Sequence, residues 1–600
     1  MDILLEKVGD KSILFLKFLK IFKKNIYYLK IDSNNREKLF IKLRSLNINP
    51  LPIADLNSLS YKTYSNIDFD PNDLILKKIN SMYSKKISKL FLKQVLNNSE
   101  KTVKLIVKDV VTDKFTHLNG YLDFWLKEKR GLFFITNSLS SLLLIDKKKN
   151  LNIIYLPTDF FYIIQKMFSK IYFVSKLILS NILSNFDKPI PKKSKTLYNN
   201  FNSVAFILHG ETFYGVSKKK ILYDKTLYYS TKHNNLKKEN IMHFGYTLKK
   251  IKDRFAKYQF LSNKLLSFKD LRLIFTFFFK SIFYIKKTSD IYLIFILFIN
   301  LRYFYSCRNI FKQFPNLKLA LIDYDFLCPK SIILALMSLK IKTIAAQERF
   351  IASFYNTQNV LIDDYFTPSK KMNNVIKKNK SIIAKNLIPV GLYRADKISL
   401  PKKNNKRKII VALGFQTEGP FYISQLEYLL NWKASKLFLE DMYKLSNDMS
   451  YCKIIIRLKI NKDYDIPYFR NIIKKIKTKK NIEIDSKTES EYSYKICSKA
   501  DLIISKHTSL ADECISREIP VIFYDYIHNM NGIIRGAFNY DNSGMINTNY
   551  TDMLNKAKKF INSRNSNINK KFLDIKKKYY FYDKKMTVKE KIHNHLIKYL

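Results

Sequence analysis

Residues 499–526 read KADLIISKHTSLADECISREIPVIFYDY, and this stretch decides the fold. It opens with a short apolar run, 502–504, that predicts a strand. Ser509 is a natural helix N-cap followed by one apolar helical face, and Pro520 ends the predicted helix. A second apolar run, rich in strand-forming residues, follows at 521–524. Strand, polar turn, short helix and strand together predict a βαβ unit of a parallel sheet.

The turn between the first strand and the helix, residues 505–509, is the predicted ligand site of this unit. In open α/β folds, ligands bind beside the turns that follow the carboxyl ends of the strands. Hydroxyl groups and unpaired helix amides in this turn suit a phosphate. Asp512 and Glu513, in the expected first helical turn, would repel a phosphate on the helix axis and suit sugar hydroxyls instead. The pattern indicates a nucleotide-sugar; the alternative is an acidic turn that only stabilises the helix.

The string DLIISxHTSLADExxxxxIPVIxYD, residues 501–525, resembles the donor-binding segment of GT-B glycosyltransferases. The resemblance is strongest to bacterial enzymes that build surface polysaccharides such as capsule and lipopolysaccharide. It is clearest over residues 405–600, weaker over 318–396 and absent before that. The resemblance implies a two-domain fold in which the second domain holds the nucleotide-sugar donor.

The same resemblance assigns roles within the turn. It implies that Thr508 and Ser509 lie beside the donor diphosphate and that Glu513 lies beside the ribose. Ser505 and His507 belong to the same turn and are further donor-binding candidates.

Two other predicted strand ends belong to the expected donor site. The apolar strand 409–413 reaches Gly414-Phe-Gln-Thr417, a turn that would face the Thr508 turn across the same sheet edge, so Gly414 and Thr417 are donor-binding candidates. Another strand, 453–456, runs into Arg457-Leu-Lys459, where related enzymes carry an Arg or Lys followed by His-Pro. A cation there could meet the diphosphate, and Arg457 is a better candidate than Lys459 because lysines are abundant on the solvated surface.

Three predicted strands nearer the N-terminus end in side chains that could take a proton from the acceptor. The candidate bases are His209, Asp325 and Glu348. They follow strands at 203–208, 319–322 and 343–346, the last two running into Asp323-Tyr324-Asp325 and Gln347-Glu348-Arg349. At His209 an ordinary β-turn is the alternative. Glu348-Arg349 stands where the resembling families carry His-Gly, which argues against a histidine-based mechanism at that position.

The sequence predicts an α/β protein of GT-B type with two Rossmann-like domains facing a cleft. The expected parts are 1–100, an N-terminal extension of unknown role; 101–398, the acceptor-side domain with helical insertions; 399–585, the nucleotide-sugar-binding domain; and 586–600, a terminal helix that packs back on the acceptor-side domain. The polar, basic residues 399–408 are the expected linker, with an ordinary solvated loop as the alternative. Strand-like runs also occur at 103–107 and 132–136.

The composition is that of a strongly basic globular protein. Of 600 residues, 47% are hydrophobic, so the chain is too long for one core and too apolar to be disordered. The net charge of +57 favours anionic surfaces such as membranes, lipid-linked phosphates or nucleic acid, although abundant Lys, Asn and Ile with scarce Gly and Pro also reflect an AT-rich genome. Five cysteines, none closely paired, argue against a zinc site or a disulfide framework and fit a reduced cytoplasm.

No segment is predicted to cross a membrane. Asp2 and Glu6 precede the first apolar run, which makes the N-terminus a poor signal peptide. The two most apolar segments, 271–285 and 291–299, are interrupted by Lys280 or too short to span a bilayer. We expect buried helices, with a membrane-docking surface as the alternative. The expected location is cytoplasmic, with peripheral contact to the inner face of the cytoplasmic membrane as an option.

These observations predict a glycosyltransferase that moves a sugar from a nucleotide-activated donor to a surface glycan or lipid-linked acceptor. A glycerophosphate- or polyol-phosphate transferase and a nucleotide-sugar epimerase share the fold and stay open, as does a non-catalytic scaffold. GT-B enzymes generally need no bound metal, and we expect neither a metal nor a bound cofactor. Nucleic-acid binding is disfavoured because the sequence has no recognition motif for it.

Overall fold

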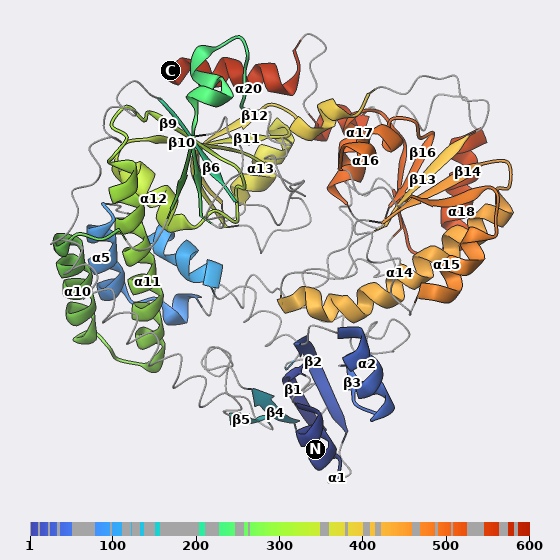
Figure 1. The fold of residues 1–600 in the computed structure, drawn as a ribbon, viewed down its shortest axis with the longest axis horizontal. Helices are drawn as coiled ribbons and strands as arrows, with labels where there is room; N and C mark the ends of the chain where they lie inside the picture. The colour runs from blue at the N-terminus through green and yellow to red at the C-terminus, as the bar shows by residue number, and fades with distance from the viewer. Residues whose placement is uncertain are drawn as a thin grey trace.

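The structure is a computed structural model of the 600-residue chain (Figure 1). It describes residues 2–9, 12–21, 25–32, 36–50, 79–96, 99–110, 122, 132–136, 151–155, 203–209, 227–246, 257–261, 265–347, 359–378, 382–399, 408–414, 422–458, 469–485, 490–505, 508–524, 545–562, 574–580 and 586–600. Within these ranges the strands form three sheets of five, seven and six strands, and every neighbouring pair runs parallel.

The first sheet is formed by the N-terminal part of the chain. Its strands are β1 (Asp2–Gly9), β2 (Ile26–Asp32), β3 (Asn49–Pro50), β4 (Leu132–Thr136) and β5 (Leu151–Tyr155), in the order β3-β2-β1-β4-β5. The helices α1 (Ile13–Ile21) and α2 (Arg36–Ser45) connect its first three strands. Since β4 pairs directly with β1, the sheet continues past residue 100, and the predicted boundary there is wrong. The N-terminal extension is a third parallel-sheet unit.

The second sheet has seven strands. They are β6 (Val204–Leu208), β7 (Met242–Gly245), β8 (Lys257–Phe260), β9 (Leu319–Ile322), β10 (Lys342–Ala346), β11 (Val360–Thr367) and β12 (Ile382–Pro389), in the order β12-β11-β10-β9-β6-β7-β8. Around it lie α5 (Lys85–Gln94), α10 (Phe268–Ile282), α11 (Thr288–Phe311), α12 (Lys330–Ser338) and α13 (Lys370–Lys378). Every residue of β6, β9 and β11 is buried, which explains the unbroken apolar sequences of β6 and β9, whereas β11 buries two aspartates, Asp363 and Asp364.

The third sheet has six strands. They are β13 (Ile409–Leu413), β14 (Lys453–Arg457), β15 (Ile482–Asp485), β16 (Leu502–Ser505), β17 (Val521–Tyr524) and β18 (Ile546–Asn547), in the order β15-β14-β13-β16-β17-β18. Its helices include α14 (Tyr422–Asp448), α15 (Arg470–Lys477), α16 (Ser490–Cys497), α17 (Ser509–Ser516) and α18 (Tyr550–Asn562). The βαβ unit predicted at 502–524 is therefore present as β16, α17 and β17.

All three sheets share one winding pattern. In each, the first strand lies inside the sheet, the second and third extend to one side, and the fourth and later strands extend to the other. This is the Rossmann strand order, and the point of reversal lies between the first and fourth strands. The reversal points are β1/β4, β6/β9 and β13/β16. Ligands bind at the carboxyl ends of strands beside such a point. Residues 209, 323, 414 and 505–509 are therefore the candidate ligand-binding positions of the second and third sheets.

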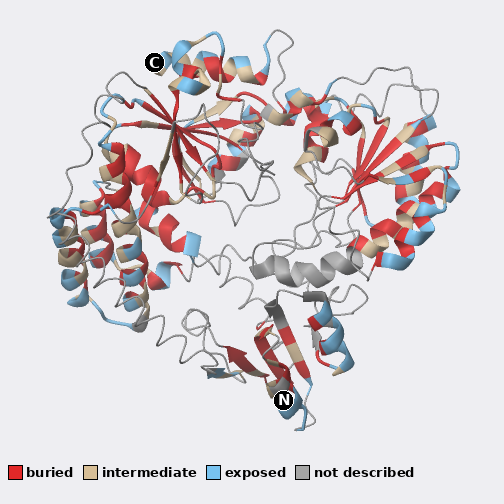
Figure 2. Cartoon of the chain, viewed as in Figure 1, coloured by how far each residue is buried: buried red, intermediate tan, exposed pale blue. Residues whose placement is uncertain are grey.

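The cores do not follow the chain in simple order. The first sheet shares one continuous apolar cluster with the third-sheet unit, and Figure 1 shows β2 lying against α14. Residues 79–110, which come between β3 and β4 in sequence, pack instead with α10 and α11 in the core of the second-sheet unit. Residues 103–107, predicted as a strand, lie in a helix over residues 100–110 because they pack in this helical layer. Figure 2 shows the buried residues concentrated on the strands and on the inner faces of the helices.

The terminal helix α20 (Val588–Leu596) returns to the second-sheet unit. Thr587 and Glu590 form the expected capping box, and the apolar side chains of α20 join the cluster of β6 and β9. The His593 Nε2 atom lies 2.9 Å from the carbonyl oxygen of Leu227. The buried carboxylate of Asp364 in β11 fixes the last residues of the chain. It accepts hydrogen bonds from His595 (2.8 Å), Tyr599 (2.9 Å) and Asn386 (2.7 Å) and pairs with Lys342 (2.7 Å).

One apolar helix is longer than the sequence suggested. The run 291–299 lies inside α11, which has 24 residues and continues through Asn300 and Arg302. The prediction that it is too short to span a bilayer is therefore wrong by length. In the described part of the chain, the segment Ser289–Phe311 is the one helix long and apolar enough to cross a membrane, and 56% of its 18-residue apolar window is buried inside the protein. Burial against neighbouring helices is what core helices of this composition show.

Candidate functional site

The reversal point of the third sheet brings the predicted donor turn together. Leu413 and Ser505 are partners in the pairing of β13 with β16. The next residue, Gly414, donates its backbone N–H to the carbonyl oxygen of Arg457 at 2.8 Å. A Cβ atom on Gly414 would lie 2.3 Å from the Leu458 side chain and 3.3 Å from the Arg457 carbonyl oxygen, so a larger residue there would require Leu458 to shift.

Thr508 caps the helix that follows β16. Its backbone is extended, and its hydroxyl accepts from the backbone N–H of Ala511 at 3.3 Å. The sequence predicted Ser509 as the cap, one residue too late, because both residues carry a suitable hydroxyl. The Thr508 and Ser505 hydroxyls lie 3.4 Å apart, so the two oxygens form one polar edge.

The shift of the cap moves the acidic residues further into the helix. Asp512 remains in the first turn, whereas Glu513 lies beyond it. Both are buried, with 1% and 3% of their surface exposed. Glu513 is thus part of the packed interior behind the turn, and the half-buried Ser509 stands at the start of the helix beside Thr508.

Arg457 ends β14 as predicted, but its charge is already matched. Its guanidinium pairs with Asp485, its partner in the register of β14 and β15, and its Nε donates to the Ser493 hydroxyl at 2.6 Å. The Tyr492 ring lies 5.7 Å from the guanidinium carbon. Arg457 is 8% exposed. Asp485 could not be predicted as the partner of Arg457, because this ion pair depends on the pairing of β14 with β15 and not on spacing along the chain.

Four predicted site residues lie outside the described part of the chain. They are Glu348, Thr417, Lys459 and His507. Their roles stay predictions, and so does the cleft between the two domains.

The reversal point of the second sheet gathers a second polar group. His209 follows β6 and Asp323 follows the neighbouring β9. The backbone N–H of His209 donates to Asp323 Oδ2 at 3.1 Å, and the backbone N–H of Asp323 donates to the Ile207 carbonyl at 2.9 Å. These bonds hold the two strand ends together, although their residues are 114 positions apart in sequence.

The His209 ring lies among tyrosines. Its Nδ1 atom is 2.7 Å from the Tyr246 hydroxyl oxygen, and its ring centre is 5.3 Å from that of Tyr324. Burial, with a smaller contribution from neighbouring Cys328, raises the pKa of the Tyr246 hydroxyl well above its usual value. Tyr246 therefore stays protonated at neutral pH. If the Nδ1–H of His209 donates to this oxygen, Nε2 carries the lone pair that can accept a proton.

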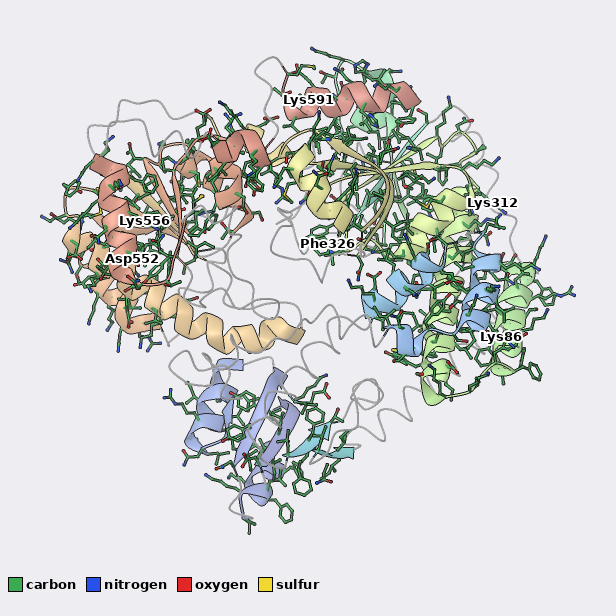
Figure 3. The ribbon with its side chains drawn as sticks, turned by 180° about the vertical axis from the view of Figure 1, so that it is seen from behind. Lys86, Lys312, Phe326, Asp552, Lys556 and Lys591 are labelled. Carbon is green, nitrogen blue, oxygen red and sulfur yellow. The ribbon has the colours of Figure 1, made fainter. Side chains whose placement is uncertain are left out.

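Asp325 is engaged within the domain. Its carboxylate accepts from the Tyr365 hydroxyl at 2.5 Å and from the backbone N–H of Phe326 at 3.0 Å, and it is 4% exposed. Lys330 stabilises the same loop, because its buried ammonium donates to the carbonyls of Phe326 and Cys328. Figure 3 labels Phe326 in this loop. Of the three candidate bases, His209 and Asp325 lie in the described part of the chain. The His209 ring contacts the Tyr246 hydroxyl, whereas the Asp325 carboxylate is buried and accepts from Tyr365.

Tyr246, Tyr365 and Lys330 were not predicted from the sequence. Tyr246 had a usable signal, since it directly follows a glycine at the end of the strand-forming run 242–245, much as Gly210 follows the run 204–208 in the sequence. Tyr365 and Lys330 had none, because they lie inside a strand and at the start of a helix.

Two Rossmann-ordered sheets in succession, with the last helix returning to the earlier of them, are the arrangement that the sequence predicted for residues 203–600. The fold is GT-B-like. In this GT-B-like pair, the His209 group and the Thr508 turn occupy the reversal points of the two sheets.

Comparison with solved structures returns proteins of the same fold class at low similarity. UDP-GlcNAc 2-epimerase from Neisseria meningitidis bound to UDP-GlcNAc is 13% identical, with 66% of this chain and 99% of that chain covered and a TM-score of 0.40. Sucrose-phosphate synthase from Thermosynechococcus elongatus is 8% identical, with 66% and 98% covered and a TM-score of 0.38. A lipopolysaccharide outer core galactosyltransferase is 10% identical, with 66% and 99% covered and a TM-score of 0.36.

No family model matches the chain, and a search of curated proteins finds no match. The GT-B-like assignment rests on strand order and on the returning helix.

Proposed function

We propose that this protein transfers a sugar from a nucleotide-activated donor to a surface glycan or a lipid-linked acceptor. The observation that carries the proposal is the pair of reversal points, one with hydroxyls at a helix start and one with a histidine among tyrosines. The first suits a diphosphate and the second suits an alcohol that must lose a proton.

The donor belongs in the third-sheet domain. Thr508 Oγ1 accepts from the backbone, which leaves its hydroxyl hydrogen available to a phosphate oxygen, and Ser505 lies beside it. The amides at the start of α17 add donors on the same side. Glu513, inside α17, and Arg457, at the end of β14, remain candidate contacts for ribose and diphosphate.

The acceptor belongs in the second-sheet domain. In the proposed reaction the acceptor oxygen bonds to the anomeric carbon of the sugar as the nucleoside diphosphate leaves with the electron pair of the broken bond. His209 takes the proton from the acceptor hydroxyl. Tyr246 holds the ring in the tautomer that this step needs. The proposal involves no metal; among the described residues no group of three or more His, Cys, Asp or Glu side chains could hold one.

A thermal-shift panel of UDP, GDP, ADP, dTDP and CMP tests the donor. A nucleotide at a hundred times its Kd stabilises the protein by about 2.7 kcal/mol, which is a clear shift. The matching nucleotide-sugar is then incubated with membrane lipid extract, and released nucleoside diphosphate and sugar-labelled lipid or glycan are measured. Stabilisation by one nucleotide and its release upon sugar transfer support the proposal.

Other outcomes identify the rivals. Conversion of the nucleotide-sugar to its epimer without an acceptor would make the protein an epimerase. Release of CMP from CDP-glycerol with a phosphate-containing product would make it a glycerophosphate transferase. No stabilisation by any nucleotide in the panel would contradict the proposed function.

A further inference from the structure

Helices α10 and α11 form a hairpin at the outer edge of the second-sheet unit (Figure 1). Helix α10 begins with a capping box of Ser267 and Asp270, and at the start of α11 the Asp290 carboxylate accepts from the backbone N–H groups of Lys286 and Lys287; both carboxylates are buried. The inner faces of both helices join the core with α5 and α12. The fold thus fixes which sides of the hairpin face outward.

The outward sides are unusually apolar. The large hydrophobic residues that are exposed on α10 and the turn after it are Phe268, Phe279, Ile282, Phe283 and Ile285. Those exposed on α11 are Ile291, Phe295 and Ile299. Phe283, in the turn, is 85% exposed, and Phe279 is 59% exposed. The Phe279 ring contacts the rings of Phe275 and Phe278, so the exposed Phe279 is part of a small aromatic cluster. Clustered exposed aromatic side chains mark an interaction surface.

The charges around this apolar surface have a single sign. The only acidic residues between 265 and 312 are the two buried aspartates, whereas the same span carries Lys269, Arg272, Lys280, Lys286, Lys287, Arg302, Arg308 and Lys312. The neighbouring α5 adds four lysines and no acid. Lys86 of α5 lies 5.2 Å from the Tyr284 ring, and Figure 3 labels it at the outer edge of this layer.

We propose that the outer face of the α10–α11 hairpin docks on an anionic membrane surface. Phe279, Phe283 and their neighbours enter the boundary between headgroups and acyl chains, and the lysines contact the anionic headgroups. Charge complementarity favours this occupant over a second copy of the chain, because the matching face of a second copy would carry the same positive charges. The inner half of α11 packs on α12, so the hairpin lies on the bilayer and does not cross it. This inference does not depend on the proposed reaction.

Vesicle co-sedimentation of the full chain tests the proposal. We compare vesicles of phosphatidylcholine alone with vesicles containing about 30% phosphatidylglycerol, at low and at high salt. The wild-type protein is expected to bind the anionic vesicles at least roughly tenfold more strongly than the neutral ones, and added salt should weaken this binding. The double variant Phe279→Ser/Phe283→Ser should lose at least roughly tenfold in partitioning, because two exposed aromatic rings no longer enter the bilayer.

Two control variants separate the hairpin from general basicity. Ile41→Ser/Tyr451→Ser removes exposed apolar side chains of the other two units and should bind as the wild type does. Lys280→Gln/Lys286→Gln should weaken anionic-vesicle binding more than Lys475→Gln/Lys477→Gln, which removes the same charge from α15. Because all of these side chains are exposed, the variants should fold, and their melting temperatures verify this.

Equal losses in the hairpin and control lysine variants would overturn the proposal, because binding would then reflect net charge alone. Unchanged vesicle binding of Phe279→Ser/Phe283→Ser would also overturn it. A concentration-dependent dimer that this variant abolishes, without vesicle binding of the wild type, would assign the face to a second copy of the chain instead.

Discussion

Arg457 offers a sharp test of structural against donor-binding roles in the third-sheet domain. Its guanidinium and the Asp485 carboxylate form an ion pair whose side chains are 9% and 7% exposed. Arg457→Ala would leave Asp485 buried without its cation. Breaking a buried pair in this way costs about 3–5 kcal/mol. For a domain of this size, that corresponds to a fall in Tm of roughly 6–20 °C.

The double variant Arg457→Met/Asp485→Leu is the matched control. It removes both charges and keeps apolar volume, so it should recover most of the stability lost by Arg457→Ala. Thermal unfolding followed by circular dichroism gives the Tm of each variant, and calorimetric titration with the stabilising nucleotide gives its Kd. A normal Tm for Arg457→Ala together with a donor affinity lowered by tenfold or more would refute the structural role. Arg457 would then be assigned to binding the donor diphosphate.

Three other predictions follow from the second-sheet unit and from the donor chemistry. His209→Gln should lower turnover at least ~100-fold with donor affinity intact, and Tyr246→Phe should lower it less; wild-type turnover of His209→Gln in a steady-state assay would place the base elsewhere. Burial alone would raise the pKa of Asp364, but the hydrogen bonds from His595 and Lys342 outweigh this effect and lower it. The stabilisation of the terminal helix by this carboxylate is therefore present above the unfolded pKa of about 3.9 and is lost as the pH falls through the lower folded pKa. Asp364→Asn should therefore increase hydrogen exchange over residues 588–600 at pH 7. Exchange equal to that of the wild type would contradict a role of Asp364 in holding the terminal helix. Treatment with EDTA should leave sugar transfer unchanged, and activity restored only by added Mg²⁺ or Mn²⁺ would show a metal requirement.

Four strands of the third sheet, β13, β14, β16 and β17, could be predicted from sequence because they are mostly buried apolar runs, whereas β15, with Glu483 exposed, and the two-residue β18 could not. Residues 502–504 and 521–524 have few polar interruptions, and the turn between them carries hydroxyls that restrict its conformation. The ambiguity between Thr508 and Ser509 as cap is a local one, which only backbone geometry resolves.

The first sheet could not be predicted in the same way. Its central strand β1 contains Asp2, Glu6 and Lys7, and one of its neighbours, β4, starts more than a hundred residues later. Residues 103–107 have strand-forming side chains, yet packing against α10 and α11 makes them helical. Similarly, His209, Tyr246 and Asp323 are brought together by parallel pairing of β6 with β7 and β9, which leaves no mark on local spacing.

The route of the chain between the first two sheets has a consequence for synthesis. When a ribosome has released residues 1–110, β1 still lacks its partner β4, and the apolar faces at Ile87 and Phe91 still lack the helices α10 and α11 that cover them. The first sheet is complete only at β5, after residues 79–96 and 99–110 of the second-sheet core have been made, and those residues stay without their partners until α10 and α11 follow. Fragments that end between residues 110 and 311 should expose apolar surface and aggregate, and the nascent chain should need a chaperone until α11 emerges.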